Sequence, residues 1–206
     1  MKRLLGALLG ILLLCVVSVA ITPIQGCGHL IRVTDMSGPP LPDEMTCDNV
    51  GVIYFDNPFY GPPVPGANWG DITAYYCDPI YFRIFGLIHW GIDIGAPMGT
   101  PVVSTVHKAT SATVIRAGYD EAMGFNVKIC TDSGWCAIYM HMESIAVVVG
   151  EQVYRGTLLG WVDNTGFSTG PHLHYQINSP PGIPVDPAPF LFFDFDFDWD
   201  ENEEQQ

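Results

Sequence analysis

The sequence is short of basic residues and of charge in general. Lys and Arg number 8 in 206 residues against 22 Asp and Glu, so the formal net charge is −14, and only 15% of the residues are charged. Binding the phosphate backbone needs clustered Lys and Arg, so nucleic acid is excluded as a partner. Hydrophobic residues reach 48%, which is too high for general disorder and suits one domain with a proper core.

Two common site motifs are also absent. The six cysteines include no Cys-x-x-Cys pair, so a cysteine zinc site or a thioredoxin-like redox centre has little support. The glycine-rich stretch 165–170 is not followed by a Gly-Lys-Ser/Thr step, which excludes a phosphate-binding P-loop. We interpret this stretch as a turn that leads His172 onto the following strand.

The N-terminus has the pattern of a targeting segment. Lys2 and Arg3 precede an uncharged, apolar stretch over residues 4–21. The pattern predicts a secretory signal cleaved after Ala20, an uncleaved membrane anchor, or a lipoprotein signal that ends at Cys27. All three deliver the domain outside the cytoplasm, and two of them anchor it to the membrane through the N-terminus.

Cysteine use agrees with an oxidising compartment. The cysteines after the apolar stretch are Cys27, Cys47, Cys77, Cys130 and Cys136. Cys130 and Cys136 flank a polar turn and could bridge the two strands of a hairpin. Either Cys27 is lipidated and Cys47 pairs with Cys77, or one thiol stays free or joins another chain.

Composition divides the chain into four segments. They are a signal or anchor (1–21), a segment rich in Pro, Gly and aromatics (22–85), a candidate domain (86–187), and an acidic and aromatic tail (188–206). The second segment has no helical period, so we expect loops with short strands there. The candidate domain has short runs rich in Val, Ile, Thr and aromatics, which predict an antiparallel all-β domain. We expect its strands at 101–105, 112–117, 126–131, 135–141, 144–149, 157–162 and 172–177.

Four of the six histidines occur in arrangements that suit one metal site. His89 and Asp93 are four residues apart, and His172 and His174 are two apart, so each pair shares one face of extended backbone. His141 ends an apolar strand. Nitrogen and oxygen donors suit Zn²⁺, whose catalytic sites keep one position open for water.

Each of these histidines alone is more often a surface or structural residue, and only their joint occurrence points to a site. His29 and His107 match no motif, and we expect both to be structural or on the surface. Three aromatic residues adjoin the motifs: Trp90, Tyr139 and Tyr175. They either line a substrate groove or pack in the core, because aromatics alternating along strands are usually core residues.

These motifs together resemble the M23 (LytM/lysostaphin-type) zinc metallopeptidases. The similar stretches, in the order of the family, are HWGID (89–93), GTPV (99–102), YMHM (139–142), the segment 149–160 and TGFSTGPHLH (165–174). The resemblance covers residues 86–187. It implies an antiparallel β-sheet or sandwich with a narrow groove, preceded by the loop-rich segment.

The resemblance also implies roles for single residues. His89, Asp93 and His174 would hold Zn²⁺, and His141 and His172 would be the catalytic histidines beside the attacking water. The implied activity is zinc-dependent endopeptidase cleavage of peptide cross-bridges in bacterial peptidoglycan, with the stem or bridge peptide as partner. Which catalytic histidine acts as the base stays open.

Three further hypotheses need a structure or an experiment. The domain could be a non-catalytic envelope factor that binds wall peptide or activates a separate amidase, although no ligand or catalytic histidine is missing. It could also be a structural or adhesive domain with an incidental metal site. Finally, the segment 22–85 could occlude the groove.

Overall fold

The computed structural model describes residue 47 and residues 49–192. The expected signal or anchor, Cys15, Cys27 and His29 lie outside the described residues, and so does the tail from residue 193 onwards. Within the described part, no helix is both long enough and apolar enough to cross a membrane.

The described residues form short strands with three brief helical segments. The strands are β1 (Ile72–Ala74), β2 (Ile92–Gly95), β3 (Pro101–Val103), β4 (Ala112–Asp120), β5 (Gly124–Cys130), β6 (Cys136–Ile145), β7 (Gln152–Val153), β8 (Leu158–Val162), β9 (His172–Ser179) and β10 (Ile183–Val185). The helical segments are η1 (Trp69–Asp71), α1 (Pro79–Phe85) and α2 (Ala188–Leu191).

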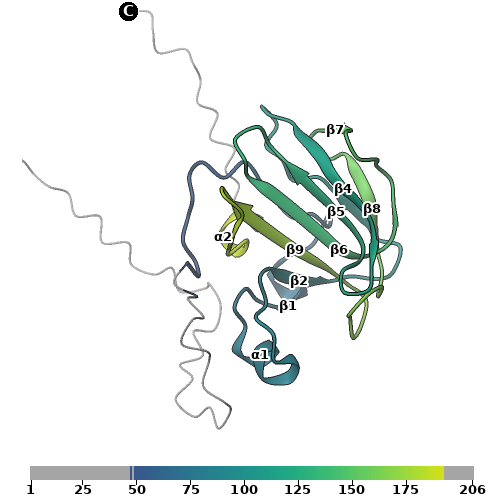
Figure 1. Ribbon diagram of the computed structural model, residues 1–206. Coiled ribbons are helices and arrows are strands. Elements are labelled where there is room, and N and C mark those ends of the chain that lie inside the picture. Colours follow the sequence, from purple (N-terminus) through teal and green to yellow (C-terminus); the bar gives the residue numbers. More distant parts are fainter. Residues whose placement is uncertain (1–46, 48, 193–206) are drawn as a thin grey trace, which may run out of the picture. The chain divides into compact units, whose positions relative to one another are not determined.

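All strand pairs are antiparallel, and the main path through the sheet is β1-β2-β9-β6-β5-β4-β7. Figure 1 shows β9, β6, β5 and β4 side by side. The sheet branches at β6, which pairs with β9 as far as Met140 and with β8 from Met142 onwards. This architecture confirms the predicted antiparallel all-β domain.

On one face of the central strands, almost all side chains are buried in the core. Ile92, Ile94 and Leu173 are fully buried, as expected where alternate side chains point away from solvent. Tyr139 and Tyr175 are buried too, and both hydroxyls lie within hydrogen-bond distance of the Thr105 hydroxyl, at 3.2 and 2.7 Å. These two tyrosines are therefore core residues and do not line a groove.

The segment expected to hold only loops and short strands also contains helix α1. Asp78 accepts hydrogen bonds from the backbone N–H groups of Ile80 and Tyr81, Pro79 is the first helical residue, and Gly86 ends the helix at φ 68°. A helix of seven residues is too short to show a periodic pattern, so the sequence analysis missed it. The cap residues at its two ends were the signal that could have found it.

Two other expectations need correction. The strand expected at 144–149 is wrong, because β6 ends at Ile145 and residues 146–151 leave the sheet for a turn. Residues 188–191, assigned to the acidic tail, form α2 and bury Phe190 in the core.

Two disulfide bonds connect parts of the fold. Cys130 and Cys136 face each other across β5 and β6 and are bonded, as the flanking turn indicated. Cys47 is bonded to Cys77, which is the pairing named in the first alternative, while Cys27 lies outside the described residues. This second bond joins the start of the described chain to the segment just before α1.

Candidate active site and metal centre

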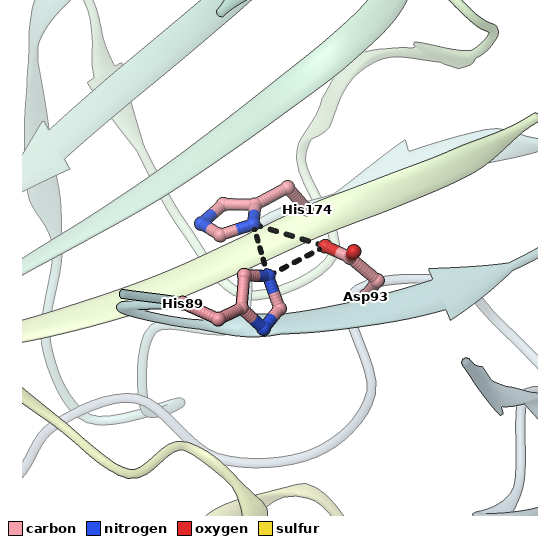
Figure 2. Close-up of side chains that lie close together, drawn as sticks. All are labelled: His89, Asp93 and His174. Carbon is pink, nitrogen blue, oxygen red and sulfur yellow. Dashed lines mark hydrogen bonds and ion pairs between the residues drawn. The ribbon is translucent and has the colours of Figure 1, made fainter. Parts of the chain in front are cut away.

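Strands β2 and β9 bring two of the candidate metal ligands together. Asp93 on β2 and His174 on β9 are direct partners in the antiparallel register, so their side chains share one face of the sheet. Ile92 and Ile94, the neighbours of Asp93, point into the core instead. His89 comes from the segment that leads into β2 and turns toward the same point (Figure 2).

The three side chains present their donor atoms to one another at short range. His89 Nε2 and His174 Nδ1 each lie 3.0 Å from Asp93 Oδ1, and the two nitrogens are 2.9 Å apart. All three residues are buried, with exposed fractions of 2%, 6% and 8% for His89, Asp93 and His174.

The hydrogen bonding of His89 tests whether this cluster suits a cation. His89 Nδ1–H donates to the Tyr75 carbonyl at 2.7 Å, which leaves a lone pair on Nε2 facing Asp93 Oδ1. Two acceptors 3.0 Å apart repel unless a cation lies between them. Bonds of 2.0–2.1 Å to a tetrahedral zinc ion would separate its ligand atoms by about 3.3 Å, close to the spacing found here. The donor set therefore fits zinc.

The protonation states in the cluster also suit a metal. Burial lowers the pKa of His174, so its imidazole is neutral and can offer a lone pair. Burial alone would raise the pKa of Asp93, but the two imidazoles whose nitrogens lie 3.0 Å from its carboxylate oxygen outweigh burial and lower that pKa overall. Asp93 is therefore an anionic donor.

His141 reaches the site through an irregularity in β6. Met140 is the register partner of His174, so in a regular strand His141 would point to the opposite face. The register shifts at this point, and His141 adopts a left-handed backbone conformation with φ 64°. The shift turns its imidazole toward the site, 4.8 Å from the His172 ring between centroids.

His141 and His172 are held by carbonyl groups of the same loop. His141 Nδ1–H donates to the Thr165 carbonyl, and His172 Nδ1–H donates to the Gly170 carbonyl, both at 2.8 Å. In each ring the Nε2 lone pair is left free, and His172 Nε2 lies 3.5 Å from Asp93 Oδ1. Burial lowers the pKa of His141 to about 4, so this imidazole is an available base at neutral pH. These two acceptors are not identifiable from the sequence alone.

A groove of about 430 Å³ runs past the cluster. Its lining residues come from three places: β1 and the turn after it (Thr73, Ala74, Asp78), helix α1 (Ile80, Tyr81, Ile84, Phe85), and the candidate site with the adjoining loop (Asp93, Phe167, Ser168, Thr169, Gly170, Pro171, His172). The described part of the segment 22–85 therefore builds one wall of the groove.

Tyr81 is a site residue that the sequence analysis missed. Its ring stacks on His89, with the centroids 4.4 Å apart and the planes inclined by 20°. It also lines the groove, and burial together with the charge of Asp93 raises its pKa. Tyr81 therefore fixes the orientation of the His89 ring from the side of α1.

Gly91 permits the close approach of β2 and β9 at the cluster. A Cβ atom at this position would lie 2.5 Å from the Tyr175 carbonyl oxygen and 2.7 Å from His174 Nε2. Two other residues singled out in the sequence do not belong to the cluster. Trp90 packs against Tyr76, and His107 packs against Tyr60 away from the cluster.

A family model described as Peptidase family M23 matches residues 87–187. The chain belongs to peptidase family M23. Lysostaphin of Staphylococcus staphylolyticus is 36% identical over 126 residues, which make up 57% of the M23 chain and 25% of lysostaphin. DD-carboxypeptidase/endopeptidase Mpg of Neisseria gonorrhoeae is 38% identical over 103 residues. These residues make up 49% of the M23 chain and 23% of Mpg. The M23 chain thus spans about a quarter of the length of these curated relatives.

Solved structures agree with this membership. A zinc containing peptidase from Vibrio cholerae matches with a TM-score of 0.51 and 28% identity, and the match covers 62% of the M23 chain and 39% of that structure. Zinc is the cofactor that the family membership assigns, and the cluster of two histidines and one aspartate fits it.

Proposed function

We propose that the chain is a zinc-dependent endopeptidase that hydrolyses peptide cross-bridges of bacterial peptidoglycan. His89, Asp93 and His174 hold the zinc ion, and His141 and His172 are the catalytic residues. The observation that carries the proposal is the convergence of three buried donor atoms within 3.0 Å of one another, with a third imidazole nitrogen, from His172, 3.5 Å from the same carboxylate oxygen.

The chemistry divides between the metal and the chain. When bound, zinc supplies Lewis-acid chemistry, polarising a carbonyl oxygen and making water more acidic. His141 and His172 provide the proton transfers, because each keeps its proton on Nδ1 and leaves Nε2 as an acceptor. One Nε2 takes a proton from the attacking water, and that proton ends on the leaving amine. The ring that delivers it carries a proton on Nε2 at that stage and can then also stabilise the developing oxyanion.

The substrate and the compartment rest on the relatives and on the cysteines. Among the relatives, one is named glycyl-glycine endopeptidase and another peptidoglycan DD-endopeptidase, which supports a wall peptide as the substrate. Two disulfide bonds support an oxidising, extracytoplasmic compartment for the domain.

Purified full-length protein acting on labelled peptidoglycan tests this function. We expect new amino termini to appear, and to disappear with a chelator and in His174→Ala. Zinc that binds at one equivalent without cleavage of any wall preparation would support the rival hypothesis of a non-catalytic envelope factor. Equal activity with and without the chelator would contradict the zinc mechanism.

A further inference from the structure

A row of side chains crosses the sheet beside the metal cluster, on strands that lie side by side in Figure 1. Gln176 on β9 pairs with Ile138 on β6. Ile138 also pairs with Lys128 on β5, and Lys128 pairs with Arg116 on β4. Register partners point to the same face of a sheet, and Gln176 is two residues from His174. The row therefore shares the face that carries the cluster.

The burial of Lys128 and its neighbours agrees with this orientation. Val127 and Ile129 are fully buried, so the Lys128 side chain between them points away from the core. Lys128 is half-buried and Arg116 is exposed. Two cationic side chains thus reach solvent on the face of the candidate active site.

Lys128 has no counter-charge in this row. Arg116 forms an ion pair with Asp120, whereas the Lys128 ammonium forms no hydrogen bond or ion pair with any described residue. The register partners of Lys128 are an isoleucine and an arginine. Like charges directly opposite each other on adjacent strands destabilise a sheet. Because the chain has only 8 Lys and Arg, placing two of them side by side points to an anion that binds there.

Lys128 lies within reach of a peptide bound at the cluster. Strand β6 separates β9 from β5, so Lys128 is about 10 Å from His174 across the strands and about 7 Å along them. The two Cα atoms are therefore about 12 Å apart, which roughly three residues of extended peptide span. The long side chain of Lys128 shortens this distance when it turns toward the cluster.

We propose that Lys128 binds a carboxylate of the peptide substrate, about two or three residues from the scissile bond. The subsite deepens the proposed peptidase function and rests on it. The ammonium group donates charge-assisted hydrogen bonds to the carboxylate oxygens, and the bound anion offsets the repulsion between Lys128 and Arg116. Bound zinc would attract a carboxylate as well, so the experiment compares proteins with equal zinc content.

Binding of wall peptides tests the subsite without turnover. Soluble cross-linked peptides released from peptidoglycan are titrated by calorimetry into zinc-loaded full-length His141→Ala, before and after carbodiimide amidation of their carboxylates. We expect the free acids to bind about tenfold more tightly than the amides. Adding Lys128→Met should bring this ratio to about one with zinc content unchanged, whereas Lys128→Arg keeps most of it. The control is Lys108→Met, in an exposed turn, which keeps the ratio.

Thermal unfolding separates a binding role from a structural one. Removing one of two opposed like charges does not weaken the sheet, so Lys128→Met should unfold at the same temperature as wild type or higher. Loss of the ratio together with a marked fall in unfolding temperature would assign Lys128 to the fold and overturn the subsite. Tetra-alanine with a free C-terminus, compared with amidated tetra-alanine carrying one glutamate, shows whether Lys128 binds a chain end or a side chain.

The remaining outcomes separate the subsite from the peptidase function. A preference for free acids that survives Lys128→Met, equal binding of acids and amides, or no binding of either form overturns the subsite. Cleavage of both forms with equal kcat/KM in wild type and in Lys128→Met leaves the peptidase function standing while the subsite fails. Acid-selective binding that Lys128→Met removes supports the subsite, even if no peptide is cleaved and the proposed function fails.

Discussion

The two sides of the groove are built differently. On the sheet side, β2 and β9 carry Asp93 and His174 between core residues, and most of the residues of both strands are buried. On the helix side, α1 buries no residue and depends on its caps. The proposed metal ligands on the sheet side are thus held by the core, whereas we expect that changes on the helix side of the groove leave the fold intact.

The largest expected effect comes from removing a ligand on the sheet side. His174→Ala should lower kcat by about 10³-fold or more, because the Lewis acid is worth several kcal/mol. Zinc content by metal analysis should fall in parallel, while His107→Ala should retain both zinc and activity. Full activity in a zinc-free His174→Ala protein would contradict the assigned cluster.

The close packing of β2 against β9 predicts a second effect. In Gly91→Ala the new methyl group would overlap the Tyr175 carbonyl and His174, so zinc affinity should fall by about 10- to 100-fold. Competition with a chromogenic chelator measures it. Gly118→Ala is the matched control, because its Cβ would meet nothing within 4 Å. Equal zinc affinity in the two variants would show that the sheet side tolerates movement.

The loop between the two sides predicts an intermediate effect. The Thr165 hydroxyl donates to the Met142 carbonyl at 2.6 Å and accepts from the Phe125 N–H at 3.1 Å, and both bonds hold the loop that orients His141. Thr165→Val should lower kcat by about tenfold with zinc content unchanged, since two polar groups lose partners. Thr165→Ser keeps the hydroxyl and should restore most of kcat. An equal loss in both variants would point to a packing role.

The helix side predicts the smallest effect. Asp78→Ala removes the cap of α1, which costs about 1 kcal/mol and loosens the helix locally. We expect KM for wall peptide to rise by a few fold while zinc content and the unfolding temperature stay nearly unchanged. Asp132→Ala, at an exposed turn, serves as the control for loss of a carboxylate. A large drop in unfolding temperature in Asp78→Ala would mean that α1 is part of the core after all.

The sequence predicted the sheet side better than the helix side, for physical reasons. The spacing His172–His174 follows the periodicity of β9, whereas His89 lies before β2 and reaches Asp93 outside the strand, and family resemblance added the implied roles. Periodicity could not place His141, because its position depends on one left-handed residue where the register shifts. Nor could it find α1, whose seven residues cover only about two turns and bury nothing.

The loop from Thr165 to Gly170 orients two histidines and also lines the groove, and it does so largely through different groups. It orients the imidazoles of His141 and His172, the proposed catalytic residues, through main-chain carbonyl groups, and the Ser168 hydroxyl also lies 3.2 Å from His172 Nδ1. Phe167 and Thr169 also line the groove. We therefore expect substitutions at these two positions to change which peptides the proposed site accepts, while the backbone carbonyl groups that orient His141 and His172 stay in place.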